Sequence, residues 1–257
     1  MGVFKHSLVL IGWIFLFLGT PIMCLAAEDE TGWRFVVTPR LWISAATIPD
    51  EDNVSNGTVL LPLYGGTLSV TPGFAPNLSV LITGLHGTAD GDGVFLDTRT
   101  DGTLDMERTD IEVLFRYAFP GTGINVHAGG RYVEFISKFD TDSGNFSNRD
   151  ETELWLGEVG VGLVRDISED GHHRMFANLT GVVGNGENDF KDSQGFQSSD
   201  SDVGVGADIN VGYQWWITSW ANVGLRYRSF VITTQNDFDL NKFVSIHGPE
   251  ASIGIVF

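Results

Sequence analysis

The feature that most constrains the fold of this chain is a series of ten segments in which every second residue is apolar. Alternation with a period of two is typical of β-strands that have one apolar face. Outside the first 27 residues, no apolar run is long enough for a membrane-spanning helix. The alternation predicts ten strands, over residues 33–45, 58–72, 77–87, 108–119, 123–138, 151–165, 173–183, 202–216, 221–234 and 244–257.

The second of these strands has the weakest pattern. Pro62, Gly65 and Gly66 interrupt it, and Pro72 ends it. Eight or twelve strands therefore stay open as alternatives to ten.

The connectors between the predicted strands alternate in length. Those after the odd-numbered strands are long, polar and acidic, whereas those after the even-numbered strands are short and turn-like. Nothing forces such a difference between the two ends of a soluble β-sandwich, but a transmembrane barrel of the outer membrane has short periplasmic turns and long external loops. The long connectors cover residues 46–56, 88–107, 139–150, 184–201 and 235–242.

The first 27 residues have the layout of a secretory signal peptide. Lys5 precedes an apolar core over 8–18, and the small residues Ala26 and Ala27 come just before an acidic segment. A membrane anchor is disfavoured because the core is short, and lipidation of Cys24 is disfavoured because no small residue precedes it. The sequence thus predicts a leader over 1–27 and one domain over 28–257, and the only cysteine leaves with the leader.

The charge of the chain excludes one large class of function. It contains 33 Asp and Glu residues against 15 Lys and Arg, a formal net charge of −18. Because nucleic-acid binding needs a basic surface to neutralise phosphates, this class is set aside. A hydrophobic content of 42% is also too high for a disordered acidic chain.

The two ends of the domain resemble those of bacterial outer-membrane β-barrels. The segment 251–257 alternates apolar and small residues and ends in Phe257, and the segment 33–42 is similar to the first strand of many such proteins. The resemblance covers the whole chain after the leader. It implies an all-β, transmembrane, antiparallel up-and-down barrel in the cell outer membrane. It also implies a monomer that contacts membrane lipid and lipopolysaccharide, and that the barrel-assembly machinery recognises through the strand ending in Phe257.

Alternate residues of each strand separate a lipid-facing side from a lumen-facing side. Aromatic residues lie near the short-turn end of the apolar side, as in a membrane-interface girdle: Phe119, Trp215, Trp220 and Phe257. The lumen side is predicted to carry Arg34, Arg40, Glu112, Arg116, His127, Arg131, Glu158, Asp208, Arg226, Arg228 and Glu250, together with Asp110, Asn125, Arg174, Asn178, Asn210 and Gln214.

Turn lengths predict which of these lumen residues face each other. A two-residue turn at 121–122 places Glu112 opposite Arg131 and Arg116 opposite His127. A three-residue turn at 217–219 places two further pairs opposite each other, Asp208 with Arg228 and Asn210 with Arg226. Because buried charges persist when they are paired, the sequence predicts a salt-bridged lumen rather than a wide pore.

The acidic connectors offer hard oxygen ligands for divalent cations. Asp90 and Asp92 form one candidate site, and Asp140, Asp142 and Asn145 form another. Neither has the spacing of an EF-hand, and solvated acidic loops are the favoured interpretation. No cofactor is expected.

Catalysis is weighed because some small outer-membrane barrels, among them the omptin-type proteases, are enzymes. His86 and Asp110 are predicted at a similar height near the outer mouth, where such a pair is able to activate a water molecule. No longer motif of those enzyme families surrounds either residue. The chain is therefore predicted not to be an enzyme.

The predicted function is structural, adhesive or surface-interacting, in an outer-membrane barrel whose lumen is filled with charges. The main alternative is a narrow channel for small solutes, in which lumenal arginines favour anions while acidic loops oppose their passage. An outer-membrane hydrolase is the least favoured alternative.

Overall fold

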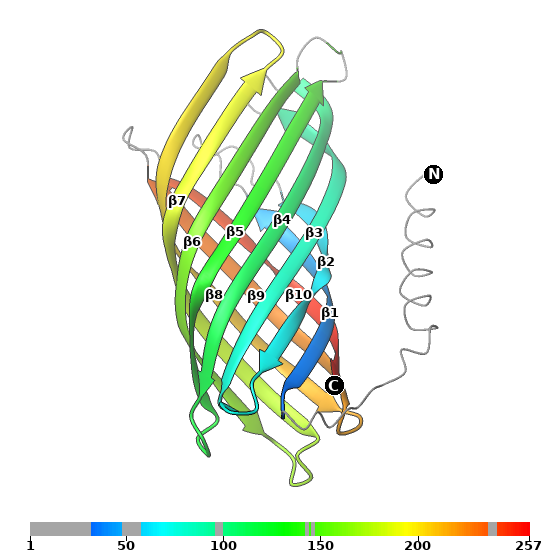
Figure 1. Ribbon diagram of the computed structural model, residues 1–257. Helices are drawn as coiled ribbons and strands as arrows, with labels where there is room; N and C mark the ends of the chain where they lie inside the picture. The colour runs from blue at the N-terminus through cyan, green and yellow to red at the C-terminus, as the bar shows by residue number, and fades with distance from the viewer. Residues whose placement is uncertain (1–31, 48–57, 96–99, 142–143, 145–146, 236–240) are drawn as a thin grey trace.

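The computed structural model is a single antiparallel sheet of ten strands that closes on itself (Figure 1). It describes residues 32–47, 58–95, 100–141, 144, 147–235 and 241–257. The leader predicted over 1–27 lies outside these residues. The prediction of ten strands is confirmed: β1 (Arg34–Thr47), β2 (Thr58–Thr71), β3 (Leu78–Phe95), β4 (Thr100–Ala118), β5 (Ile124–Thr141), β6 (Ser147–Asp166), β7 (His173–Asp192), β8 (Gln197–Trp216), β9 (Ala221–Gln235) and β10 (Asn241–Val256).

Closure of the barrel occurs between the first and the last strand. β1 pairs with β10 in a register that places Val36 opposite Val256. The ladder continues to the last residue, because Phe257 donates its N–H to the carbonyl of Phe35 (2.8 Å) and accepts the N–H of Phe35 in return (3.2 Å). A closed sheet has no edge, so its backbone groups are satisfied within the wall.

Among the residues that the structure describes, no helix is long and apolar enough to cross a membrane.

The strands agree with the prediction at the short-turn end and are longer than predicted at the other end. Most of the connector predicted over 88–107 consists of the end of β3 and the start of β4, and the connector predicted over 184–201 consists largely of β7 and β8. These connector predictions are wrong because a strand outside the membrane has two polar faces, so the alternation of apolar residues disappears while the hydrogen-bonded ladder continues.

The extra length is confined to one side of the barrel. Strands β3 to β8 have 18 to 20 residues, whereas β9, β10, β1 and β2 have 14 to 16. In Figure 1 the hairpin of β7 and β8 rises above the tops of β9 and β10. We call the protruding part of β3 to β8 the extended wall.

The outer surface of the barrel has the apolar belt that a membrane requires. Its side chains are large and exposed, as for Phe115 (56%) and Val159 (67%). At the short-turn end the predicted aromatic residues Phe119, Trp215 and Trp220 are exposed on this surface. An apolar belt with aromatic side chains at its margin is typical of an outer-membrane barrel, and this is the membrane in which the chain lies.

Candidate functional site

Glycines on the lumen face make room for the polar side chains inside the barrel. A Cβ atom on Gly160 would lie 2.4 Å from Nε2 of His127, and one on Gly162 would lie 2.1 Å from Oδ1 of Asn178 and 2.6 Å from Nδ2 of Asn125. These neighbours occupy the space that a side chain at either position would need. Large polar groups therefore fit inside a barrel of only ten strands.

Arg131 of β5 is the centre of an ion-pair network that crosses the lumen. Its guanidinium group donates a very short hydrogen bond to Glu112 of β4 and lies 3.0 Å from Oε1 of Glu158 of β6. It also donates to Asp208 of β8, at 2.9 Å, and β5 and β8 are not neighbours in the sheet. The network thus joins strands that are not adjacent in the wall through the interior.

Three further arginines form ion pairs in the same layer of the lumen. Arg228 donates from Nε to Asp208 at 2.9 Å and lies 3.7 Å from Glu112. A second group is centred on Glu250, which accepts a hydrogen bond from Arg226 (2.7 Å) and lies 3.6 Å from Arg40. We call these eight residues the charged layer: Arg40, Glu112, Arg131, Glu158, Asp208, Arg226, Arg228 and Glu250.

An aromatic and aliphatic layer lies on the outer side of the charged layer. Trp42 and Phe230 are fully buried, and the guanidinium groups of Arg228 and Arg131 lie over their rings, at 5.0 and 5.1 Å from the centroids. Arg108 packs near both rings, at 5.3 and 5.8 Å. We call this the apolar cap; its other buried members are Leu61, Leu63, Leu85, Met106, Ile246, Val133, Leu154, Leu156, Val182 and Ile232.

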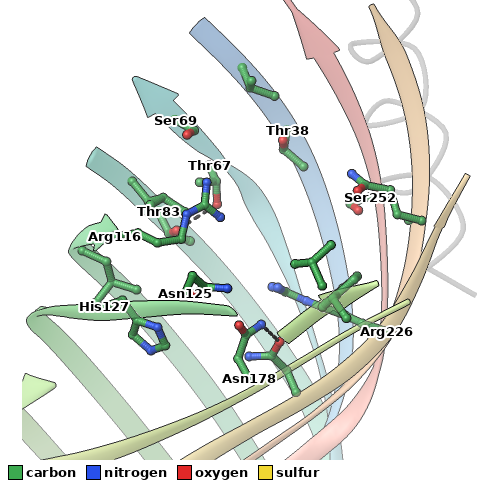
Figure 2. Close-up of a pocket in the computed structure, with 18 of the residues that line it drawn as sticks. Thr38, Thr67, Ser69, Thr83, Arg116, Asn125, His127, Asn178, Arg226 and Ser252 are labelled. Atoms are coloured by element: carbon green, nitrogen blue, oxygen red, sulfur yellow. Dashed lines mark hydrogen bonds between the residues drawn. The ribbon is translucent and has the colours of Figure 1, made fainter. Parts of the chain in front are cut away.

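A polar cavity of about 490 Å³ lies on the opposite side of the charged layer. Its lining includes residues beside the short turns, such as Phe119, Gly123 and Trp216, so it opens at the end that faces the periplasm. We call it the vestibule. Figure 2 shows hydroxyl, amide and guanidinium groups from several strands directed into it, with Thr67 hydrogen-bonded to Thr83 at 2.8 Å.

The structure brings the residues predicted for the lumen together in this region. Of the eleven principal ones, all except Glu158 and Glu250 line the vestibule, and these two are buried in the charged layer. The predicted pairing of Glu112 with Arg131 and of Arg116 with His127 is confirmed by the register of β4 and β5.

The register predicted for β8 and β9 is wrong by two residues. Asp208 lies opposite Phe230, and Arg228 lies opposite Asn210. The reason is that the turn is centred one residue later: Trp216 lies opposite Asn222 and Ile217 donates to the carbonyl of Ala221 (3.0 Å), so residues 218–220 rather than 217–219 form the turn. Asp208 nevertheless contacts Arg228, because diagonal neighbours on one face of a sheet are within reach of a long side chain.

Three central residues of the lumen are absent from the sequence prediction. Arg108, Trp42 and Phe230 are all fully buried. Arg108 and Trp42 have the same parity as the predicted lumen residues Asp110 and Arg40, so continuing the alternation by two residues would have found both. Arg108 donates two hydrogen bonds of 2.7 Å to Asp110.

The structure separates His86 and Asp110, the pair that was weighed for catalysis. Their side chains project from opposite faces of the barrel wall, because Leu85 lies opposite Asp110 while His86 lies opposite Thr109. His86 hydrogen-bonds Thr109 at 3.1 Å and contacts the ring of Tyr64 on the outer surface, whereas Asp110 is buried inside with Arg108.

The structure places the cation candidates differently from the sequence. Asp90 lies on β3 and Asp140 on β5 rather than in loops, and the side chain of Asp92, as well as Asp142 and Asn145, falls outside the described residues. A different acidic group lies on β5 and β6, where one ligand atom from each side chain is within 4.8 Å of the others: Glu134, Glu151 and Glu153.

Comparison with known proteins gives a fold and no family. No protein-family profile matches the sequence, and no curated protein matches it either. The structure is similar to the outer membrane protease OmpT from Escherichia coli, with a TM-score of 0.59 and 8% identity over 87% of this chain and 97% of that one. This likeness supports an outer-membrane β-barrel fold, and the protease activity is a property of OmpT.

Two other solved barrels align with lower scores. The transport unit of the autotransporter AIDA-I from Escherichia coli has a TM-score of 0.45 and 11% identity, covering 92% of this chain and 93% of that one. Neisserial surface protein A has a TM-score of 0.39 and 10% identity, covering 86% of this chain and 96% of that one.

Proposed function

We propose that this protein is a closed outer-membrane barrel that anchors the extended wall at the cell surface, in a structural or surface-interaction role. The observation that carries this proposal is the ion pair between Arg131 and Asp208, which crosses the lumen at 2.9 Å under the apolar cap. Both side chains are almost completely buried. A permanent plug of this kind suits an anchor better than a path for solutes.

The energetics of the charged layer disfavour the narrow channel. A conducting state would have to separate Arg131 from Asp208 and displace the fully buried ring of Phe230. Breaking a buried ion pair so that a charge loses its partner costs about 3–5 kcal/mol. At that cost the open state would be populated at less than about 1%.

The extended wall offers a surface for interaction outside the membrane. Its outer side carries Glu134, Glu151 and Glu153, just above Tyr132 and Trp155, which lie opposite each other near the upper margin of the apolar belt. Acidic side chains at this height suit contacts with lipopolysaccharide through bridging divalent cations. The proposed partners are therefore the lipid and lipopolysaccharide around the barrel.

Conductance of the refolded protein in planar bilayers tests the proposal. The wild-type barrel is expected to give no steady openings, and the double variant Trp42→Ala, Phe230→Ala is expected to give brief ones, because it removes two fully buried rings from the apolar cap. Trp155→Ala is the matched control, since this tryptophan is 64% exposed on the outer surface. Steady openings of the wild-type protein would overturn the proposal in favour of the channel.

A further inference from the structure

The vestibule contains more arginines than there are carboxylates to pair with them. Seven arginines line it, and the ion pairs of these arginines involve only five carboxylates. Within the described part of the chain, Arg34 and Arg116 form no ion pair. The unpaired positive charge is therefore that of Arg34 and Arg116.

These two arginines are close enough to act on each other. Arg34 at the start of β1 and Arg116 of β4 lie in one row across the wall of the vestibule, because Arg34 is opposite Thr71, Thr71 hydrogen-bonds Ser79 (2.9 Å), and Ser79 is opposite Arg116. Two cations that share a partly desolvated cavity without a counterion favour the binding of an anion between them.

The other groups around Arg116 are suited to an oxyanion. Figure 2 shows its guanidinium group in the cavity near the hydroxyl groups of Thr67 and Thr83, with the amide of Asn125 close by. Guanidinium groups donate in pairs to phosphate oxygens, and hydroxyl and amide groups supply further donors. No carboxylate partner of Arg116 competes for these donors among the described residues.

We propose that the vestibule is a binding site for small soluble phosphate-bearing solutes of the periplasm, with Arg34 and Arg116 as the residues that hold the phosphate group. Its volume of about 490 Å³ lies within the range of small-molecule sites. The mouth beside Phe119 and Trp216 gives access from the periplasmic side only, since the charged layer and the apolar cap close the other side. The site requires the vestibule and does not depend on whether the barrel conducts.

A phosphate group has two possible sources, a soluble solute or the headgroup of a phospholipid. The donors lie inside the closed wall, so a headgroup would have to leave the membrane leaflet to reach Arg116. The soluble source is therefore the one that the geometry favours.

Isothermal titration of the refolded full chain in a phosphate-free detergent tests this inference, with inorganic pyrophosphate and glycerol phosphate as probes. The wild-type protein is expected to bind one pyrophosphate, more weakly as salt is raised. Arg116→Gln and Arg34→Gln are each expected to reduce the affinity roughly tenfold, because each removes one set of charge-assisted hydrogen bonds. Arg116→Lys, which keeps the charge but loses the paired donors, is expected to fall between.

Arg165→Gln is the matched control. This residue lies on β6 near the same end of the barrel but is exposed and outside the lining of the vestibule. The affinity of the Arg165→Gln variant for pyrophosphate is expected to equal that of the wild type. Heat-dependent gel migration establishes that every variant is folded. Absence of saturable binding, or equal affinities for Arg116→Gln and Arg165→Gln, would overturn the inference.

A second titration separates the two sources of phosphate. The affinity for pyrophosphate is expected to be the same in detergent and in nanodiscs of phosphatidylglycerol. A marked loss of affinity in the nanodiscs would show that lipid headgroups occupy the vestibule and would overturn the soluble source.

Discussion

Replacing Arg131 with Met removes the residue that links three carboxylates of the charged layer. Glu112 and Asp208 retain Arg228 as a partner, at 3.7 and 2.9 Å. Glu158 retains none, because its one ion pair among the described residues is with Arg131, at 3.0 Å. That contact is within ion-pair distance but lacks hydrogen-bond geometry, and neither carboxylate oxygen of Glu158 accepts a hydrogen bond from a described residue. The substitution therefore leaves one buried carboxylate without any counterion.

The expected cost follows from this difference between the three carboxylates. Removing one partner of a buried ion pair destabilises a protein by about 3–5 kcal/mol, and most of this penalty should arise at Glu158. Glu158→Gln alone leaves Arg131 paired with Glu112 and Asp208, so it should cost less than about 1 kcal/mol. The double variant Arg131→Met, Glu158→Gln should then recover about 1–3 kcal/mol relative to the sum of the two single changes.

Urea unfolding of the barrel in phospholipid vesicles, followed by tryptophan fluorescence, measures these free energies. Arg149→Met is the matched control, because its ion pair with Glu151 is exposed and should contribute about 0–1 kcal/mol. If the effects of Arg131→Met and Glu158→Gln simply add, the two residues are not coupled and the account of the charged layer is refuted.

Two further substitution pairs test the placement of individual side chains by the same unfolding measurement. Asp110→Asn should destabilise the barrel by about 3 kcal/mol, because its arginine partner is fully buried and loses its counterion, whereas His86→Phe on the lipid-facing surface should change the stability by less than about 1 kcal/mol. Equal effects would contradict their placement on opposite faces of the wall. Gly162→Ala should cost about 1–3 kcal/mol, because its Cβ would overlap two asparagine amides, while Gly157→Ala, whose Cβ would have no neighbour closer than 3.5 Å, should be nearly neutral.

The sequence predicts the membrane-spanning part of this fold well because lipid imposes a simple rule there. Side chains that face lipid must be apolar, so strands such as β5 and β8 show clear alternation between 124 and 132 and between 203 and 215. Above the belt both faces of the wall meet water and the rule ends. The extended wall therefore cannot be detected from a pattern of apolar residues, although the ladder between β4 and β5 is continuous up to the pair formed by Gly102 and Thr141.

The pairing of lumen residues was predictable only where the turn fixes the register. The turn between β4 and β5 contains Gly121 and Gly123, both with positive φ, and such residues limit the turn types available. The turn between β8 and β9 contains no glycine, and the residue on which it is centred is not encoded in an obvious way. A register error of two residues keeps every side chain on its own face, which is why the contact between Asp208 and Arg228 survives the error.

The charged layer closes the lumen, and it also affects the alternation of polar and apolar residues along the strands that carry it. Glu112, Arg131 and Asp208 place charges on the lumen face of β4, β5 and β8, below the apolar cap. An apolar lumen would give the same barrel strands with two apolar faces, and such strands aggregate before they reach the membrane. Burying paired charges gives little net stability, so their benefit lies in specifying which face turns toward lipid. An apolar replacement has to include Glu158 and Arg228 together with Glu112, Arg131 and Asp208, because either residue would otherwise stay buried without a counterion. Replacement of all five residues should leave the stability of the refolded barrel nearly unchanged while lowering the yield of refolding from urea, and a lower stability with an unchanged yield would contradict this role of the charged layer.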